Sequence, residues 1–194
     1  MKYDVGSYGE YLIYLNLKHL EPQGCKFLFN IYVPMKGEDS TEIDVLMICS
    51  KGIFVFESKN YSGWIFGNEK QKNWTQMLFK GNRKVKIPFY NPMTQNKTHI
   101  NCLKKNLKKD IPYWSIITFS DRCELKNINW ESEDIFVIHR CELIKTIKEV
   151  CNNIKEPILS SEEIDEIYEK LYPYTQISEE EKQKHIENIQ KYKK

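Results

Sequence analysis

The sequence has few arginines and no long apolar run. Only Arg83, Arg122 and Arg140 are arginines, although lysine and arginine together number 29. Lysine lacks the planar guanidinium that reads guanine edges, so the chain is poorly equipped to read DNA bases directly. No window approaches the run of about 18 apolar residues that spans a membrane, and the first residues lack the basic and apolar segments of a signal peptide. We therefore expect a cytoplasmic protein with no membrane partner.

The six cysteines lack the spacing of a structural metal site. None of them stands in a Cys-x-x-Cys pair, and several lie inside apolar runs. A disulfide framework or a zinc knuckle is therefore not expected. Free thiols fit the reducing cytoplasm.

The charge of the whole chain is nearly balanced. The 29 basic and 27 acidic side chains leave a net charge of +2, so binding of nucleic acid must come from a local patch rather than from bulk charge. One such patch lies between residues 70 and 86, where basic residues are interleaved with Trp74 and Phe79, as in surfaces that bind phosphates and stack on bases. Core packing is the favoured alternative for the aromatic rings. The basic candidates for nucleic-acid binding are Lys70, Lys72, Lys80, Arg83, Lys84 and Lys86.

One domain of ordinary size is the expected organisation. A chain of 194 residues that is 41% hydrophobic can bury a stable core but is too short for two full enzyme domains. The apolar spacing predicts an α/β domain over residues 1–155, followed by a helical C-terminal extension over 156–194. Helices are predicted over 8–20, 91–108 and 142–150, and two more begin at 160 and 178. Strands are predicted over 26–33, 41–49, 53–59, 63–66, 73–79, 114–119 and 135–138. The first three strands should form an antiparallel meander, and residues 81–86 a basic hairpin or loop.

Charged residues gather at one end of the second hairpin of this meander. Side chains alternate between the two faces of a strand, so Asp44 lies on one face of its strand, and Glu57 and Lys59 share one face of the next. A two-residue turn at Lys51-Gly52 would place Asp44 opposite Lys59, whereas a four-residue loop from Cys49 to Gly52 would place it opposite Glu57. Either register brings the two carboxylates and the ammonium within about 5–8 Å of one another.

Two carboxylates this close repel each other unless a positive charge lies between them. Oxygen ligands with open water positions suit Mg²⁺ or Mn²⁺, and such an ion activates water for attack on a phosphate. Lys59 would stabilise the negative charge that develops in the transition state. The plain alternative is a solvated strand end with one salt bridge.

Several segments together resemble a known family. They are GEYLIYLNL, TEIDVLMICSKGIFVFESKNYSGWIFG with a tryptophan shortly after, and NPMTQNKTHINCL. In this order they resemble the nuclease-related domain (NERD) family of the PD-(D/E)XK nuclease superfamily, from Gly9 to about Leu107. The resemblance implies a restriction-endonuclease-like fold, in which a mixed β-sheet is flanked by helices.

The resemblance also implies a role for each matching residue. Asp44 and Glu57 would bind the metal, and the backbone carbonyl of Ser58 would add a ligand. Lys59 would be the catalytic lysine, and the remaining catalytic candidates are Glu10 and Gln95. The sequence departs from the family's pattern at Ile43, where the superfamily name gives proline, and at Glu42, where related sequences often have glutamine.

The expected function is hydrolysis of DNA with little sequence preference and with Mg²⁺ or Mn²⁺ as cofactor. RNA is a possible substrate, and a homodimer is possible because cutting both strands at once needs two active sites. The alternative is a regulatory module that has the same fold, binds nucleic acid or protein, and has little or no activity. We further expect His99 to be hydrogen-bonded near the site rather than a metal ligand, and Asn91 to cap a helix.

Overall fold

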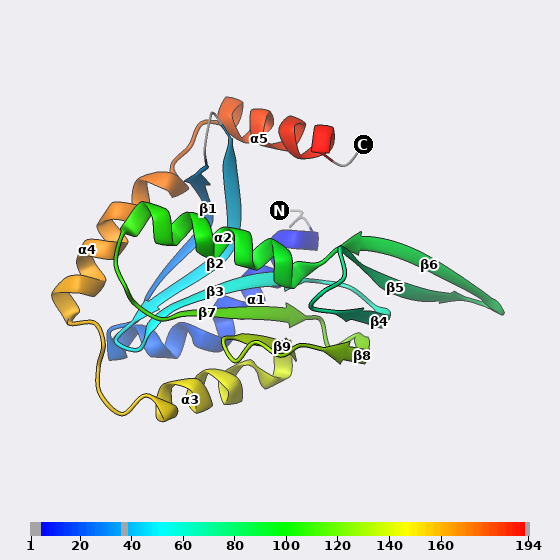
Figure 1. Ribbon diagram of the computed structural model, residues 1–194, viewed down its shortest axis with the longest axis horizontal. Coiled ribbons are helices and arrows are strands. Elements are labelled where there is room, and N and C mark those ends of the chain that lie inside the picture. Colours follow the sequence, from blue (N-terminus) through cyan, green and yellow to red (C-terminus); the bar gives the residue numbers. More distant parts are fainter. Residues whose placement is uncertain (1–4, 36–38, 193–194) are drawn as a thin grey trace.

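A five-stranded sheet forms the centre of the molecule. The structure, a computed structural model, describes residues 5–35 and 39–192. Within these residues the sheet has the order β1-β2-β3-β7-β9 (Figure 1). The first three strands are antiparallel, as the sequence predicts, whereas β3, β7 and β9 are parallel. The strands are β1 (Lys26–Pro34), β2 (Ser40–Cys49), β3 (Gly52–Lys59), β7 (Tyr113–Phe119) and β9 (Ile135–His139).

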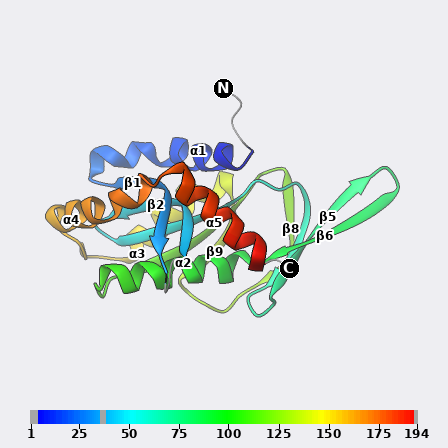
Figure 2. The ribbon, with the colours of Figure 1, turned by 90° about the horizontal axis from the view of Figure 1, so that it is seen from above.

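Helices cover both faces of this sheet because its strands are apolar on both sides. Val45, Met47, Phe54 and Phe56 pack with α1 and α3, while the alternating positions of the same strands pack with α2 and α4. Figure 2 shows α1 and α2 on opposite sides of the sheet. The helices are α1 (Val5–Leu17), α2 (Pro92–Leu107), α3 (Leu143–Asn153), α4 (Ser161–Leu171) and α5 (Glu179–Tyr192), with the 3-10 helices η1 (Lys18–Gln23), η2 (Arg140–Glu142) and η3 (Tyr172–Thr175). The α/β fold with a helical C-terminal region confirms the predicted fold class.

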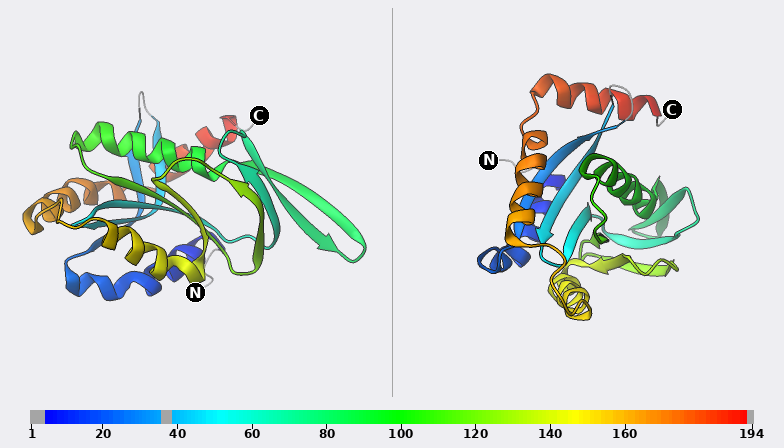
Figure 3. Two further views of the ribbon diagram at one scale, coloured as in Figure 1. Left: turned by 60° about the horizontal axis from the view of Figure 1, so that its bottom comes forward. Right: turned by 60° about the vertical axis from the view of Figure 1, so that its left-hand side comes forward.

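A second sheet extends from one end of the first. Among the described residues it has the order β6-β5-β4-β8, and its β5–β6 hairpin projects beyond the rest of the molecule (Figure 3). Gly67 lies directly under the buried Trp74 ring, with no room for a Cβ atom, and Trp74 stacks on Phe119. The strands are β4 (Gly63–Asn68), β5 (Asn73–Lys80), β6 (Arg83–Tyr90) and β8 (Cys123–Asn129).

This sheet confirms the predicted basic hairpin and contains one strand that the sequence does not predict. The segment 81–86 belongs to a hairpin, the first of the two predicted forms: Lys80 pairs with Arg83, so two residues form the turn and the rest begins β6. The strand β8, which pairs in parallel with β4, was not expected at all. Polar and apolar residues alternate from Lys84 to Ile87 in β6, whereas in β8 the alternation breaks between Leu125 and Ile128, where the register with β4 shifts.

The C-terminal helices pack on the domain. Ile164, Ile167 and Leu171 of α4 belong to the same apolar cluster as β1, β2 and α2. The helix α5 contacts the residue just before β2, where Asn188 Nδ2 donates to Asp39 Oδ1 at 2.7 Å. The division of the chain at residues 155 and 156 stays a prediction. No helix in the described part of the chain is long and apolar enough to cross a membrane.

Candidate active site

The end of the β2–β3 hairpin separates where its charged residues begin. The strands pair from Cys49 and Gly52 to Val45 and Phe56, and the next positions along the two strands are Asp44 and Glu57. This register is the one in which the two carboxylates face each other, although the turn itself consists of Ser50 and Lys51. Both side chains therefore start from adjacent strands on the face covered by α2.

Glu57 is a buried carboxylate with a partner at each oxygen. Its side chain is 2% exposed, Lys59 Nζ lies 2.5 Å from Oε1, and His99 Nε2 lies 3.2 Å from Oε2. Burial by itself would raise the pKa of Glu57, but Lys59 and His99 outweigh it and the pKa is lowered. Burial likewise acts to lower the pKa of Lys59, but Glu57 and Asp44 raise it overall. The pair is therefore held in its charged form.

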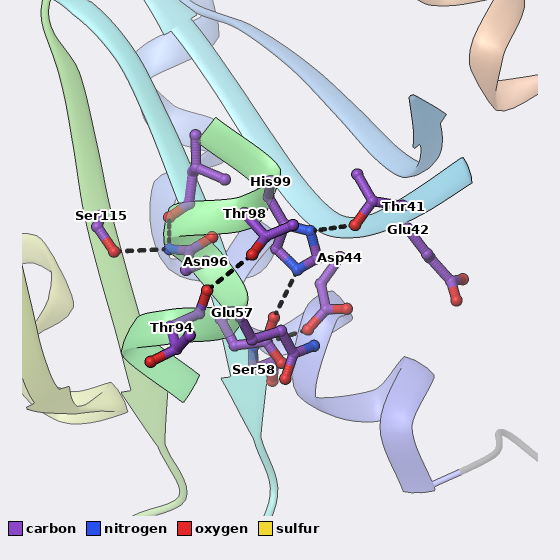
Figure 4. A network of polar contacts seen from close by, with 12 residues as sticks. Thr41, Glu42, Asp44, Glu57, Ser58, Thr94, Asn96, Thr98, His99 and Ser115 are labelled. Atoms are coloured by element: carbon purple, nitrogen blue, oxygen red, sulfur yellow. Dashed lines mark hydrogen bonds and ion pairs between the residues drawn. The ribbon is translucent and has the colours of Figure 1, made fainter. Parts of the chain in front are cut away.

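Asp44 is less well compensated. Its Oδ2 accepts the backbone N–H of Ser58 at 2.7 Å (Figure 4). Burial and then the neighbouring Glu57 carboxylate raise its pKa well above the ordinary value, and Glu10 adds to the effect. The first-helix acid Glu10 thus lies close enough to act on this carboxylate. Without a cation beside it, the charged form of Asp44 is therefore disfavoured.

The helix α2 brings two further side chains to the carboxylates. Asn91 Oδ1 accepts the N–H of Met93 at 2.9 Å, which confirms the predicted cap. Gln95 and His99 are one turn apart on the helix and face the hairpin, since Lys59 Nζ donates to Gln95 Oε1 at 3.2 Å. His99 Nδ1 lies 2.7 Å from Thr41 Oγ1 (Figure 4). His99 is hydrogen-bonded beside the site, as expected from the sequence.

Two residues that position this helix were missed from the sequence. Asn96 is buried, and its Nδ2 donates to Val55 O at 2.8 Å and to Ser115 Oγ at 2.9 Å, which joins α2 to β3 and β7 (Figure 4). Thr41 fixes the ring of His99 from β2. The sequence does carry a signal for Asn96, because it is a polar residue on a helix face whose other positions are mostly apolar. The role of Thr41 can be recognised only from its contact with His99 in the folded protein.

The donor set at this hairpin suits a hard divalent cation that keeps several water ligands. Asp44 and Glu57 supply carboxylate oxygens from adjacent strands, and the peptide of Ser58 lies against Asp44 through its N–H. In the described residues no group of three or more His, Cys, Asp or Glu side chains is arranged to hold a metal. Two carboxylates and one main-chain oxygen would therefore leave the remaining positions to water, as is common for Mg²⁺. A cation would stabilise the charged form of Asp44, which burial and Glu57 disfavour, and this is the observation that fits a metal here.

The six basic candidates for nucleic-acid binding do not form one compact patch. Lys80, Arg83, Lys84 and Lys86 lie along the projecting half of the β5–β6 hairpin. Lys70 and Lys72 lie just before the other end of β5. The strand runs from Asn73 to Lys80, so at about 3.3 Å per residue this end is about 23 Å from the tip of the hairpin. There Lys70 forms an exposed ion pair with Glu131. The structure thus arranges these charges along an arm.

The fold and the site define a class of protein. A mixed sheet flanked by helices, with two carboxylates and a lysine at the end of a hairpin, is the arrangement of restriction-endonuclease-like nucleases. The sequence profile of the nuclease-related domain matches residues 5–120, and the chain therefore belongs to this family. It is 32% identical over 184 residues to an uncharacterised protein of Bacillus anthracis, an alignment that covers 95% of this chain and 83% of that protein. No solved structure matches the chain.

Proposed function

We propose that the protein hydrolyses phosphodiester bonds of DNA in a divalent-metal-dependent reaction with little sequence preference. The observation that carries this proposal is the convergence of Asp44, Glu57 and Lys59 where β2 and β3 separate. Membership of the nuclease-related domain family supports it. The scarcity of arginine supports the weak sequence preference, because bidentate reading of guanine depends mainly on arginine.

Asp44 and Glu57 would hold Mg²⁺ or Mn²⁺, together with the backbone carbonyl of Ser58. When bound, such an ion neutralises the phosphate and lowers the pKa of a water molecule. Lys59 is held between Glu57 and Gln95, so its ammonium is fixed in place to donate to a phosphate oxygen as negative charge develops. Gln95 and Glu10 support the site by orienting Lys59 and by adding negative charge beside Asp44.

DNA would be bound through the projecting hairpin. Its basic side chains are exposed and lie along an extended arm, which suits contacts with successive phosphates rather than with one base step. RNA presents the same phosphates and is the alternative substrate. A second copy of the chain would be needed to cut both strands of a duplex at once.

Plasmid digestion tests the proposed activity. The purified protein should cleave DNA with Mg²⁺ or Mn²⁺ and not with EDTA. Lys59→Ala should lower the rate about 10²–10³-fold, and Asp44→Asn should abolish metal-dependent cleavage. Lys105→Ala, which removes an exposed lysine from the same helix that carries Gln95, is the matched control and should cut like the wild type. Equal cleavage by all four proteins would refute the assignment.

A nucleic-acid-binding module without turnover is the second candidate. The observation that favours it is that both oxygens of Glu57 are already paired, to Lys59 and to His99. Such a module would bind DNA or RNA with a steep salt dependence and would show the same affinity after Asp44→Asn. Binding without cleavage of single-stranded DNA, duplex DNA and RNA in any metal would favour this function over the first.

A further inference from the structure

A pocket of about 560 Å³ lies at the carboxyl ends of the three parallel strands. Asn60 directly follows β3, Ser120 to Arg122 follow β7, and Arg140 follows β9, and all of these residues line the pocket beneath Tyr8 of α1. In open α/β sheets, the crevice outside the carboxyl ends of parallel strands is where ligands bind. None of these residues has a role in the site described above.

Arg140 is a buried cation without hydrogen-bond acceptors at two of its nitrogens. Its side chain is 6% exposed, and its Nε and Nη2 atoms have no acceptor among the described residues. A buried guanidinium is costly unless it is paired and hydrogen-bonded. An anion bound at this arginine would supply the missing acceptors and balance its charge.

Arg122 holds a second guanidinium at the same pocket. Its Nη2 donates to Asn60 Oδ1 at 2.9 Å, and its Nε donates to Ser120 Oγ at 3.1 Å, so the exposed side chain is fixed in orientation. Burial lowers the pKa of Arg140; Asp121 opposes this effect and Arg122 adds to it. Asp121 also lines the pocket, but its Oδ1 already accepts the N–H of Cys141 at 3.0 Å. Two cations against one engaged carboxylate leave the pocket positive.

The pocket and the carboxylate cluster share one end of β3 but lie on opposite faces. Glu57 and Lys59 face α2, whereas Ser58 faces α1, where its Oγ lies against Gly9. Asn60 is the residue after Lys59, and Ser120 N donates to the carbonyl of Lys59 at 3.0 Å. A strand that crosses this edge of the sheet would therefore contact both sites.

We propose that Arg122 and Arg140 bind a phosphate group of the nucleic acid in this pocket, beside the site of hydrolysis. This inference rests on the proposed function for its ligand. Guanidinium groups bind phosphate oxygens through paired, charge-assisted hydrogen bonds, and two of the three arginines of the chain meet here. The phosphate belongs either to a strand end or to the backbone next to the bond that is cut.

Titration with inorganic phosphate at constant ionic strength, followed by the NMR amide signals of the wild-type protein, tests the pocket directly. Saturable shifts should concentrate at Asn60, Ser120 and their neighbours. Arg122→Gln, which changes an exposed residue and should not disturb folding, is expected to weaken binding about tenfold or more. Lys145→Gln removes an exposed charge on α3, away from the pocket, and should leave binding unchanged. Absent or non-saturating shifts, or equal effects of the two substitutions, would overturn the proposal.

Oligonucleotides distinguish the two sources of the phosphate. Affinities are measured with the Asp44→Asn protein for single strands with a 5′-phosphate, a 3′-phosphate or hydroxyl groups at both ends. Tighter binding of one phosphorylated end, lost on adding Arg122→Gln, supports a terminal phosphate. Equal binding of all three strands, weakened by Arg122→Gln but not by Lys145→Gln, supports a backbone phosphate. Identical effects of these two substitutions on every strand would overturn the proposal.

The two proposals fail in different ways. Phosphate binding that depends on Arg122, without DNA cleavage in any metal, supports the phosphate site and refutes the nuclease function. Metal-dependent cleavage that is unaffected by Arg122→Gln, together with no phosphate binding, refutes the phosphate site and supports the nuclease function.

Discussion

Replacement of Asn91 tests how firmly the start of α2 is held against the second sheet. This side chain is fully buried. Its Oδ1 caps the helix at Met93, and its Nδ2 donates to the carbonyl groups of Asn68, Glu69 and Gln71 at 2.7–3.2 Å. Loss of the cap costs about 1 kcal/mol, and loss of the two amide hydrogens costs about 1 kcal/mol each. Asn91→Ala should therefore lower the free energy of unfolding by about 3 kcal/mol.

Asn91→Asp separates the two contributions. Aspartate caps helices as well as asparagine does, but here its carboxylate would face three carbonyl oxygens and donate nothing. We expect a loss of at least about 2 kcal/mol, from the missing donors alone. Ser160→Asp is the control, because Ser160 Oγ caps α4 at Glu163 N and its side chain donates to no backbone carbonyl that the structure records, so its change should stay below about 1 kcal/mol.

Urea unfolding at pH 7, extrapolated linearly to zero denaturant, measures all three variants. If Asn91→Asp is as stable as the wild type, the amide donors of Asn91 contribute nothing and the reasoning is refuted. If it is destabilised while Ser160→Asp is not, the anchoring of α2 to the β4–β5 turn is established. That anchoring sets the place of Gln95 and His99 at the site.

Three further predictions concern the second sheet, the metal and the arm. Gly67→Ala would force a methyl group into the ring of Trp74 and should destabilise the fold by about 1–3 kcal/mol, with a change in tryptophan fluorescence; an unchanged urea midpoint would contradict this packing. Mg²⁺ at 100 times its dissociation constant should stabilise the wild type by about 2.7 kcal/mol. Thermal unfolding with and without Mg²⁺ measures this gain, and Asp44→Asn should show none. The double substitution Lys84→Gln and Lys86→Gln should weaken DNA binding alike for all sequences and reduce the slope of log K against log salt by about 1.8; an unchanged slope would exclude contact of these lysines with phosphates.

The faces of the β2–β3 hairpin could be predicted from the sequence because side-chain alternation depends only on local geometry. Both registers considered keep Asp44, Glu57 and Lys59 on one face, so the convergence did not depend on the turn. The register of the hairpin does depend on the turn, and the turn depends on a contact with a distant segment. Gly52 has φ of +114° and lies against the carbonyl of Pro112, with no room for a Cβ atom. Helical spacing likewise placed Gln95 and His99 together.

The remaining features depend on contacts between distant segments. The strand β8 is an exposed edge strand with mostly polar residues, and it becomes a strand by pairing with β4 about 60 residues earlier in the chain. Arg140 gives no local signal either, because its pocket is assembled from the ends of three separate strands. Single positions whose environment comes from elsewhere in the fold cannot be assigned from their own neighbours.

The projecting hairpin also has a consequence for solubility. The strand β6 is an edge of its sheet, and an exposed edge with free backbone groups can pair with another chain and aggregate. Arg83, Lys84 and Lys86, followed by Pro88, are the residue types that oppose such pairing. The charges proposed to contact DNA thus also protect the edge, so apolar replacements in the arm should promote aggregation, whereas glutamine replacements leave Arg83 and Pro88 as protection.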